Sequence, residues 1–414
     1  MTRTRWWILS LVFLATTVNY LDRNVINTLQ PVIKQEMKFN DQTYGNIVSA
    51  FQFFYMIGFL LAGKFIDRFG VRMGYAVAGL WWTVAAALTP LAAAPMQLAF
   101  WRGMLGLGEA GNFPAAVKTV SEWFPQRDQA LAVGIFNSGT SIASMIGPPL
   151  FVALNAAYGW RTCFLITSSF GLLWLVVWWF SYRLPHEHQG VNQAELAYIR
   201  SDAAKEGEPA VSWRQALSYK QTWGFACGKF FSDPVWWFYL SWLPPYLYDV
   251  RKFDLKAIGW ALPVIYLAAD IGSIGGGWIA GRLIRGGKTV AQARKMVMGW
   301  SAACMPVAAC CVLADQAYLA IALVSVATFA HQSWSANLYA TTPDVFPRNA
   351  VASVTGIGGA VGALGGFLFS GAGAGFIIQH FGYTPAFLMM GAFHLTGFAL
   401  VHLLMGDLKP VKAK

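Results

Sequence analysis

Two pairs of opposite charges interrupt apolar runs that are long enough to cross a membrane. Arg102 and Glu109 lie in LAFWRGMLGLGEAGNFPAAV, and Asp22 and Arg23 lie in WWILSLVFLATTVNYLDRNVI. A charged side chain at the centre of a membrane-spanning helix costs about 2.5–3.5 kcal/mol on insertion scales. A separation of seven residues is nearly two helical turns, so Arg102 and Glu109 are expected on one helix face, about 10 Å apart. Four such charges in the first four spans indicate a function.

The composition is that of a protein that crosses the membrane many times. The chain has 414 residues, of which 56% are hydrophobic and 12% are charged, and its mean hydropathy is +0.46. A soluble domain would be about one quarter charged. The net charge of +11 comes from cations in short loops between apolar runs, without the basic stripe that would bind nucleic acid. The five cysteines form no CxxC pair and no metal-ligand spacing, so neither a metal nor a cofactor is expected.

Twelve apolar windows of about 20 residues can be placed along the chain. They cover residues 7–29, 44–63, 74–93, 96–118, 130–154, 162–182, 222–247, 257–281, 294–314, 316–340, 352–378 and 384–405. The first window has no signal-peptide cleavage site and is interpreted as a retained helix. The sequence therefore predicts an all-α membrane protein with a six-helix bundle at 1–182, a cytoplasmic linker at 183–220 and a second six-helix bundle at 221–414.

The distribution of cations predicts the orientation in the membrane. Cytoplasmic loops carry an excess of Lys and Arg. If the N-terminus is cytoplasmic, about 21 of the 30 cations fall on the inside, and the outer loops keep only six. Both termini are therefore expected in the cytoplasm.

The two halves of the chain repeat short motifs in the same order. GKFIDRFGVR at 63–72 follows the second span, and GWIAGR at 277–282 follows the eighth. Phe-Pro precedes the fifth and the eleventh spans at 124–125 and 346–347, with Gly-Ile ten residues later in both cases. Two six-span halves repeated in parallel are the architecture of major facilitator transporters, whose substrate site lies at mid-membrane between the halves.

The loop G-x-x-x-D-R-x-G-x-R at 63–72 resembles the signature loop of the major facilitator superfamily. Further stretches resemble the anion:cation symporter family, and the hexuronate transporters most closely. They are YLDRN at 20–24, the segment 102–109, EWFP at 122–125, AVGIFN at 132–137, GPP at 147–149, DP at 233–234, AHQ at 330–332 and DVFPRN at 344–349. The resemblance implies the major facilitator fold and symport of an organic anion with a cation.

The four intramembrane charges are the candidate site for an anion and for protons. Arg102 is the expected carboxylate receptor, with Arg23 beside it, because a guanidinium matches a carboxylate with two hydrogen bonds. Glu109 and Asp22 are the expected proton acceptors. Burial raises the pKa of a carboxyl group and a nearby guanidinium lowers it, so alternating between these environments loads and releases a proton. The alternative is a set of structural ion pairs that hold the helices together.

Polar and aromatic side chains at helical spacing are candidates for contacts with a polyol. They are Tyr20, Tyr55, Asn137 and Thr140 in the first half and Gln332, Trp334 and Asn337 in the second. His331, Asp233 and Asp270 remain open between functional and structural roles. Asp233 is expected to pair with Lys229, which lies four residues earlier on the same helix.

The loop at 63–72 is expected to act as a gate on the cytoplasmic side. Asp67, Arg68, Arg72 and Arg127 are the candidate gating residues. Asp67 is expected to contact a helix end and a neighbouring cation such as Arg127. Because Gly281 stands at the matching position of the second half, no carboxylate is expected to compensate there.

These features together predict a monomeric secondary transporter in a bacterial inner membrane. It would import a sugar-acid anion with protons by alternating access, and hexuronates such as glucuronate or galacturonate are the first expectation. Aldonates such as galactonate are the alternative, and coupling to sodium remains open. A membrane-embedded enzyme is a distant alternative, because the sequence shows no nucleophile with a base, no metal-ligand set and no phosphate loop.

Overall fold

The computed structural model describes residues 2–39, 41–201, 213–253, 255–347 and 350–411. Those residues form helices and contain no strand. The helices are α1 (Thr4–Met37), α2 (Asp41–Leu88), α3 (Pro95–Glu109), α4 (Asn112–Trp123), α5 (Gln126–Tyr158), α6 (Trp160–Ser181), α7 (Gln193–Ile199), α8 (Trp213–Ser218), α9 (Lys220–Asp249), α10 (Leu255–Arg285), α11 (Val290–Ala309), α12 (Ala317–Val345), α13 (Val351–Gly366), α14 (Gly373–Phe381) and α15 (Tyr383–Met405).

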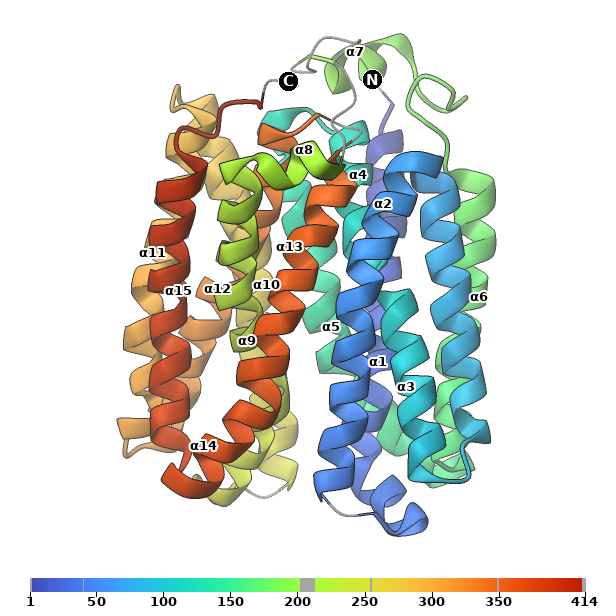
Figure 1. Cartoon of the computed structure of the whole chain (residues 1–414), viewed down its shortest axis with the longest axis vertical. Helices are drawn as coiled ribbons and strands as arrows, with labels where there is room; N and C mark the ends of the chain where they lie inside the picture. Colours follow the sequence, from blue (N-terminus) through green and yellow to red (C-terminus); the bar gives the residue numbers. More distant parts are fainter. Residues whose placement is uncertain (1, 40, 202–212, 254, 348–349, 412–414) are drawn as a thin grey trace.

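The helices form two bundles that stand side by side, α1–α6 in one and α9–α15 in the other (Figure 1). The short helices α7 and α8 of the segment between the bundles lie at the end of the molecule that also holds both chain termini. We call this end the terminal face. The predicted all-α fold with twelve crossings is confirmed: α2 supplies two crossings, α3 with α4 supplies one, and α13 with α14 supplies one.

Two predicted spans are interrupted in the observed helices, and two others correspond to the two parts of α2. The spans predicted at 44–63 and 74–93 are two helices that meet at Gly70, whose φ of 81° and ψ of 163° are not helical. The span predicted at 96–118 is interrupted after Glu109, between α3 and α4. The span predicted at 352–378 contains a π-helical segment, Phe367–Ala372, between α13 and α14. Glycine makes the break at Gly70 possible, because it adopts positive φ without a steric cost.

Three crossings that carry charged side chains do not qualify as membrane spans by length and composition. Eight helical segments of the described chain are long and apolar enough to cross a membrane by length and composition alone, and one of them contains both crossings of α2. The remaining crossings, α1, α3 with α4, and α9, do not meet these criteria of length and composition. They contain Asp22 and Arg23, Arg102 and Glu109, and the Lys229–Asp233 pair.

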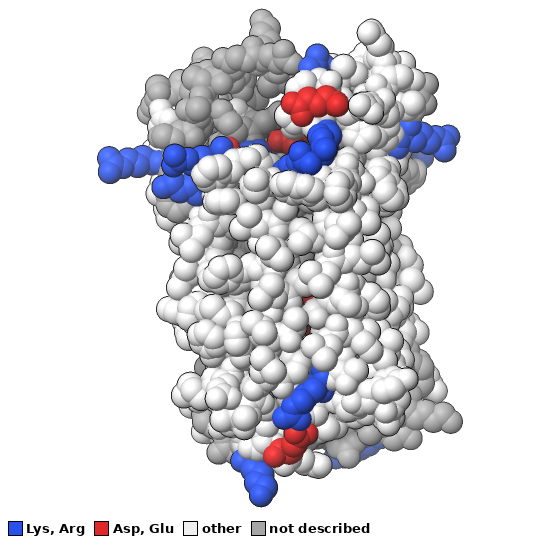
Figure 2. Space-filling model, turned by 90° about the vertical axis from the view of Figure 1, so that its right-hand side faces the viewer, with Lys and Arg blue, Asp and Glu red and all other residues white. Residues whose placement is uncertain are grey.

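The outer surface suits a lipid environment. Figure 2 shows charged side chains near the two ends of the molecule and a broad band of uncharged residues between them. Large apolar side chains such as Leu173, Phe180 and Leu403 are more than half exposed on the helices. Exposure of apolar side chains around the middle of a helix bundle is expected where lipid replaces water.

The two bundles approach each other closely at glycines. A Cβ atom at Gly277 of α10 would overlap the carbonyl oxygen of Ala130 in α5, and one at Gly134 of α5 would overlap that of Ser273 in α10. On the other side of the interface, a Cβ atom at Gly63 of α2 would lie 2.6 Å from the carbonyl oxygen of Ala352. These positions bring the backbones of opposite bundles into contact.

Replacing Gly277 by Ala is expected to destabilise this closed arrangement by about 1–3 kcal/mol, because the added methyl group overpacks the α5–α10 contact. Thermal unfolding of the purified protein measures the change. Gly275→Ala is the matched control, since a Cβ atom there meets no atom within 4 Å. The control should unfold at the same or a higher temperature, and equal melting of the two variants would contradict the close approach.

Candidate functional site

A narrow cavity of about 30 Å³ lies between the bundles. A space of this size accommodates about one water molecule, so the cavity has to widen before a larger ligand fits. Its walls come from α1, α2, α4 and α5 of one bundle and from α9 and α12 of the other. The lining residues are Tyr20, Tyr55, Phe59, Phe113, Asn137, Thr140, Lys229, Asp233, Trp236, Trp237, His331, Gln332, Ser335 and Tyr339.

The amide and hydroxyl groups on the cavity wall join the bundles by hydrogen bonds. Asn137 of α5 donates from Nδ2 to Oε1 of Gln332 in α12 at 2.7 Å and lies 3.3 Å from the Ser335 hydroxyl. Gln332 in turn donates from Nε2 to the Thr140 hydroxyl at 3.2 Å. The structure therefore brings together the side chains of Asn137, Thr140 and Gln332 that the sequence singled out.

Two of the side chains expected there lie elsewhere. The Trp334 ring is fully buried against His394 and Phe398, with ring centroids 5.4 Å and 6.3 Å apart. Asn337 donates to the carbonyl oxygen of Ser333 within α12 at 3.0 Å. Neither residue lines the cavity, so the structure does not bring Trp334 and Asn337 together with the other candidates, and their contact with a ligand stays a prediction. Both project from a different face of α12 than Gln332 does.

The intramembrane charges are paired across helices. Nε and a terminal nitrogen of Arg23 in α1 each lie 2.9 Å from Oε2 of Glu109 in α3. It also lies against the rings of Tyr20 and Tyr55, 4.4 Å and 4.7 Å from their centroids. Both tyrosines line the cavity. Arg23 therefore stands directly behind the cavity wall while it neutralises Glu109.

Arg102 occupies a deeper position than expected. Its guanidinium lies 4.9 Å from the centroid of Phe51, whose ring also contacts Arg23 at 4.8 Å, and Arg102 is not among the cavity-lining residues. Glu109, which the spacing placed on the same helix face as Arg102, pairs with Arg23 of another helix. Asp22 is fully buried and forms no ion pair within the described residues. It lies within electrostatic range of Glu109 and Arg102.

The second bundle contributes an ion pair that the sequence did not assign to the site. Lys229 and Asp233 of α9 are 2.5 Å apart, and both line the cavity. Their i,i+4 spacing was visible in the sequence, but their direction toward the cavity was not. His331 also lines the cavity, stacked on Trp236 with 5.4 Å between ring centroids. Asp270 is buried in α10 outside the cavity wall.

The carboxylate of Asp67 joins the two bundles near the terminal face. It accepts hydrogen bonds from the backbone N–H groups of Ala352 and Ser353, at 3.3 Å and 2.6 Å, at the first turn of α13. The N-terminus of a helix attracts a negative charge. Asp67 also pairs with Lys118 of α4 at 2.7 Å. The helix end expected as its partner is therefore α13, and the cation is Lys118 instead of Arg127.

The other candidate gating cations have separate partners. Arg68 lies against the ring of Phe69, and Arg72 donates to the carbonyl oxygen of Trp179 at 2.8 Å. Arg127 lies 4.8 Å from the ring centroid of Tyr198 in α7. Each of these contacts stays within one bundle or joins it to α7.

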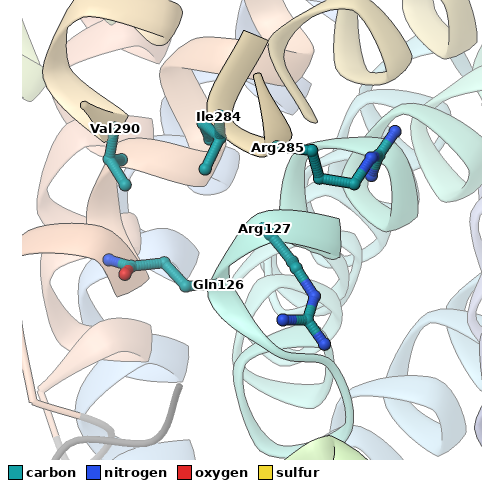
Figure 3. Close-up of a pocket in the computed structure, with 5 residues that line it drawn as sticks. All are labelled: Gln126, Arg127, Ile284, Arg285 and Val290. Carbon is teal, nitrogen blue, oxygen red and sulfur yellow. The ribbon is translucent and has the colours of Figure 1, made fainter. Parts of the chain in front are cut away.

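A carboxylate of the first bundle lies close to the matching position of the second bundle, where none was expected. A Cβ atom at Gly281 would lie 3.0 Å from the carbonyl oxygen of Arg127. Beside it, Arg285 of α10 pairs with Asp128 of α5 at 3.5 Å, and Asp128 accepts a hydrogen bond from Tyr198 at 2.7 Å. Figure 3 shows Arg127 and Arg285 in the groove of about 500 Å³ next to this contact. The first bundle thus supplies the acid that Gly281 lacks.

Asp67→Asn is expected to open the terminal face, because the amide loses the charge that attracts α13 and Lys118. Conformational couplings of this kind amount to about 1–3 kcal/mol. Distances between spin labels at Glu187 and Lys288, both exposed on that face, report the opening. Asp407→Asn is the control, since that carboxylate is exposed and pairs with Lys409. Unchanged label distances in the Asp67 variant would exclude a latch.

Comparison with known proteins identifies the architecture. The family model described as Major Facilitator Superfamily matches residues 12–370. The chain is 32% identical over 398 residues to the hexuronate transporter of Escherichia coli (strain K12), covering 95% of this chain and 92% of that protein.

The chain belongs to the major facilitator superfamily.

A second relative and a solved structure agree with this membership. The galacturonate transporter of Dickeya chrysanthemi is 34% identical over 279 residues, covering 66% of this chain and 81% of that protein. The proton:xylose symporter XylE, bound to 6-bromo-6-deoxy-D-glucose, superposes with a TM-score of 0.78 at 14% identity, covering 99% of this chain and 97% of that chain. The major facilitator chain described here is therefore a multi-pass membrane transporter and not an enzyme.

Proposed function

We propose that this transporter imports a sugar-acid monoanion, a hexuronate such as glucuronate or galacturonate, together with protons. The observation that carries the proposal is the buried Arg23–Glu109 ion pair directly behind Tyr20 and Tyr55 of the cavity wall. Relatives named for hexuronate and galacturonate transport support the substrate class. The protein works as a monomer in a bacterial inner membrane, without a cofactor and with the terminal face in the cytoplasm.

Protonation couples to anion binding through this ion pair. A proton on Glu109 removes the negative charge that holds the guanidinium of Arg23. Arg23 can then move toward the cavity and bind a carboxylate with two charge-assisted hydrogen bonds. Arg102 keeps a second positive charge close by, and Asp22 is a second acceptor for protons. Proton and anion therefore bind together, which is the requirement for symport.

Sugar hydroxyls take over the hydrogen bonds that now join the bundles. Asn137, Thr140 and Gln332 satisfy one another across the cavity. Opening the cavity separates these groups, and a polyol replaces the lost partners with its own hydroxyls. The bundles then close around the ligand without leaving buried polar groups unpaired. Release on the terminal face requires the contact of Asp67 with α13 to break.

Counterflow in proteoliposomes tests the proposal. Labelled glucuronate should exchange with unlabelled glucuronate and galacturonate, and glucose, the neutral sugar of the same size, should not compete. An inside-alkaline pH gradient should drive accumulation, and a protonophore should abolish it. Accumulation that follows a sodium gradient at constant pH would overturn proton coupling. Competition by glucose equal to that by glucuronate would overturn the assignment to sugar acids, and stronger competition by galactonate would favour an aldonate.

A further inference from the structure

Lys229 and Asp233 are the only Lys, Arg, Asp or Glu side chains among the described residues that line the cavity. Both belong to α9, and their side chains are only 5% and 13% exposed. The Lys229 ammonium donates to the Tyr339 hydroxyl at 2.7 Å and lies 4.1 Å from the centroid of that ring. The pair thus presents a cation and an anion side by side to the cavity.

The surrounding helices hold the carboxylate of Asp233 in place. A Cβ atom at Gly362 of α13 would overlap its Oδ2 atom and lie 3.2 Å from Cβ of Lys229. The absence of a side chain at Gly362 therefore provides the space that Asp233 occupies. On the other side, Tyr339 stacks on Phe113 of α4 with ring centroids 5.0 Å apart. Because the pair is packed between two helices, its negative charge stays at the cavity wall.

The opposite wall has an arginine behind it. Arg23 lies behind Tyr20 and Tyr55, and the ring of Tyr55 is 6.1 Å from that of Trp237 in α9. Tyr20 is within electrostatic range of both Arg23 and Asp233. A ligand in the cavity therefore has an arginine behind one wall and a neutral ion pair on the other.

We propose that the Lys229–Asp233 pair makes the transporter select sugar monoacids over sugar diacids. This inference rests on the proposed function. A monoacid that places its carboxylate toward Arg23 presents hydroxyl groups to the pair, and a hydroxyl can donate to Asp233 and accept from Lys229. A diacid presents a second carboxylate to the same place. Because Asp233 already neutralises Lys229, the pair offers no net positive charge to balance that carboxylate, and its burial costs free energy. Selectivity of this kind arises because the wrong ligand leaves a charge unpaired in the site.

The decisive variant is Asp233→Asn, which keeps the shape of the side chain and removes its charge. Inhibition of labelled glucuronate counterflow by galacturonate and by galactarate, its diacid counterpart, gives a ratio of inhibition constants for each protein. In the unmodified protein galacturonate should inhibit much more strongly. In Asp233→Asn the ratio should shift toward the diacid by at least about tenfold, the scale expected for removal of a close like charge. The Asp233→Asn variant should therefore bind galactarate more strongly than the unmodified protein does.

Two further variants separate the charge from other effects. Asp233→Glu keeps the negative charge and should retain the preference for the monoacid. Asp270→Asn removes a buried carboxylate of the same bundle that does not line the cavity, and it should leave the ratio unchanged. If Asp233→Asn does not support counterflow, tryptophan fluorescence quenching by the two acids in the purified protein supplies the same ratio.

The outcomes distinguish this inference from the proposed function. If the unmodified protein exchanges no sugar acid, the proposed function fails. If it exchanges glucuronate but the ratio in Asp233→Asn equals that of the unmodified protein, the selectivity role of the pair is overturned while the function stands. Equal inhibition of the unmodified protein by galacturonate and galactarate would also overturn it.

Discussion

Glu109→Gln is expected to abolish proton-driven accumulation while exchange of labelled substrate continues. Glutamine imitates the protonated acid, so the ion pair with Arg23 is permanently lost and anion binding no longer requires a proton. Uptake under an imposed pH gradient should fall to the rate without a gradient, and counterflow should remain measurable. Asp22→Asn should have a milder effect in the same direction, because Asp22 forms no ion pair with a described residue.

The two assays together decide the role of Glu109. Glu122→Gln is a suitable control, because that buried acid bonds Tyr182 within the first bundle and does not line the cavity. Full concentrative uptake by the Glu109→Gln protein would exclude Glu109 as the coupling site. Loss of counterflow as well as accumulation would indicate instead that the ion pair is needed to form the site.

The second large effect concerns the two arginines. Arg23→Lys should weaken anion binding by about 10–100-fold, because lysine keeps the charge but loses the planar fork that a carboxylate matches. Arg102→Lys should also weaken binding, and by a smaller factor, since Arg102 lies behind Phe51 and off the cavity wall. Calorimetric titration with glucuronate measures both constants. The reverse order of the two effects would return the carboxylate to Arg102, the receptor that the sequence favoured.

The fold could be predicted from the sequence because hydropathy indicates where the chain crosses the membrane. Twelve apolar windows correspond to twelve crossings, since a bilayer requires every backbone group to be bonded within the chain and so allows few alternatives. The errors fall where a helix is interrupted within a crossing. The break after Glu109 divides one crossing between α3 and α4, and a π-helical segment lies between α13 and α14.

The candidate site was predictable as a set of residues but not as a set of contacts. Spacing along one helix placed Arg102 near Glu109, whereas the observed partner, Arg23, comes from another helix. Rotation of one helix relative to another cannot be derived from the spacing within either. Helical periodicity did contain one unused signal: Gln332, Ser335 and Tyr339 recur at intervals of three and four along α12 and line the cavity. Trp334 and Asn337 lie outside that series.

The π-helical segment Phe367–Ala372 keeps a row of small residues facing one neighbour along the whole eleventh crossing. Positions four residues apart drift by about 40° per step around an α-helix. Gly358, Gly362, Gly366, Ser370 and Ala374 are nevertheless all buried. The first three leave room for Phe225, Asp233 and Trp237 of α9, and the Ser370 carbonyl accepts a hydrogen bond from Trp242 of the same helix.

A π turn rotates less per residue than an α turn, so it reverses part of the accumulated drift. The additional residue in the π turn therefore restores the direction in which the small residues face. Deleting one residue from the segment would return it to α geometry. The small residues of α14 would then no longer face α9. The small residues before the deletion and those after it would then face different directions around the helix axis.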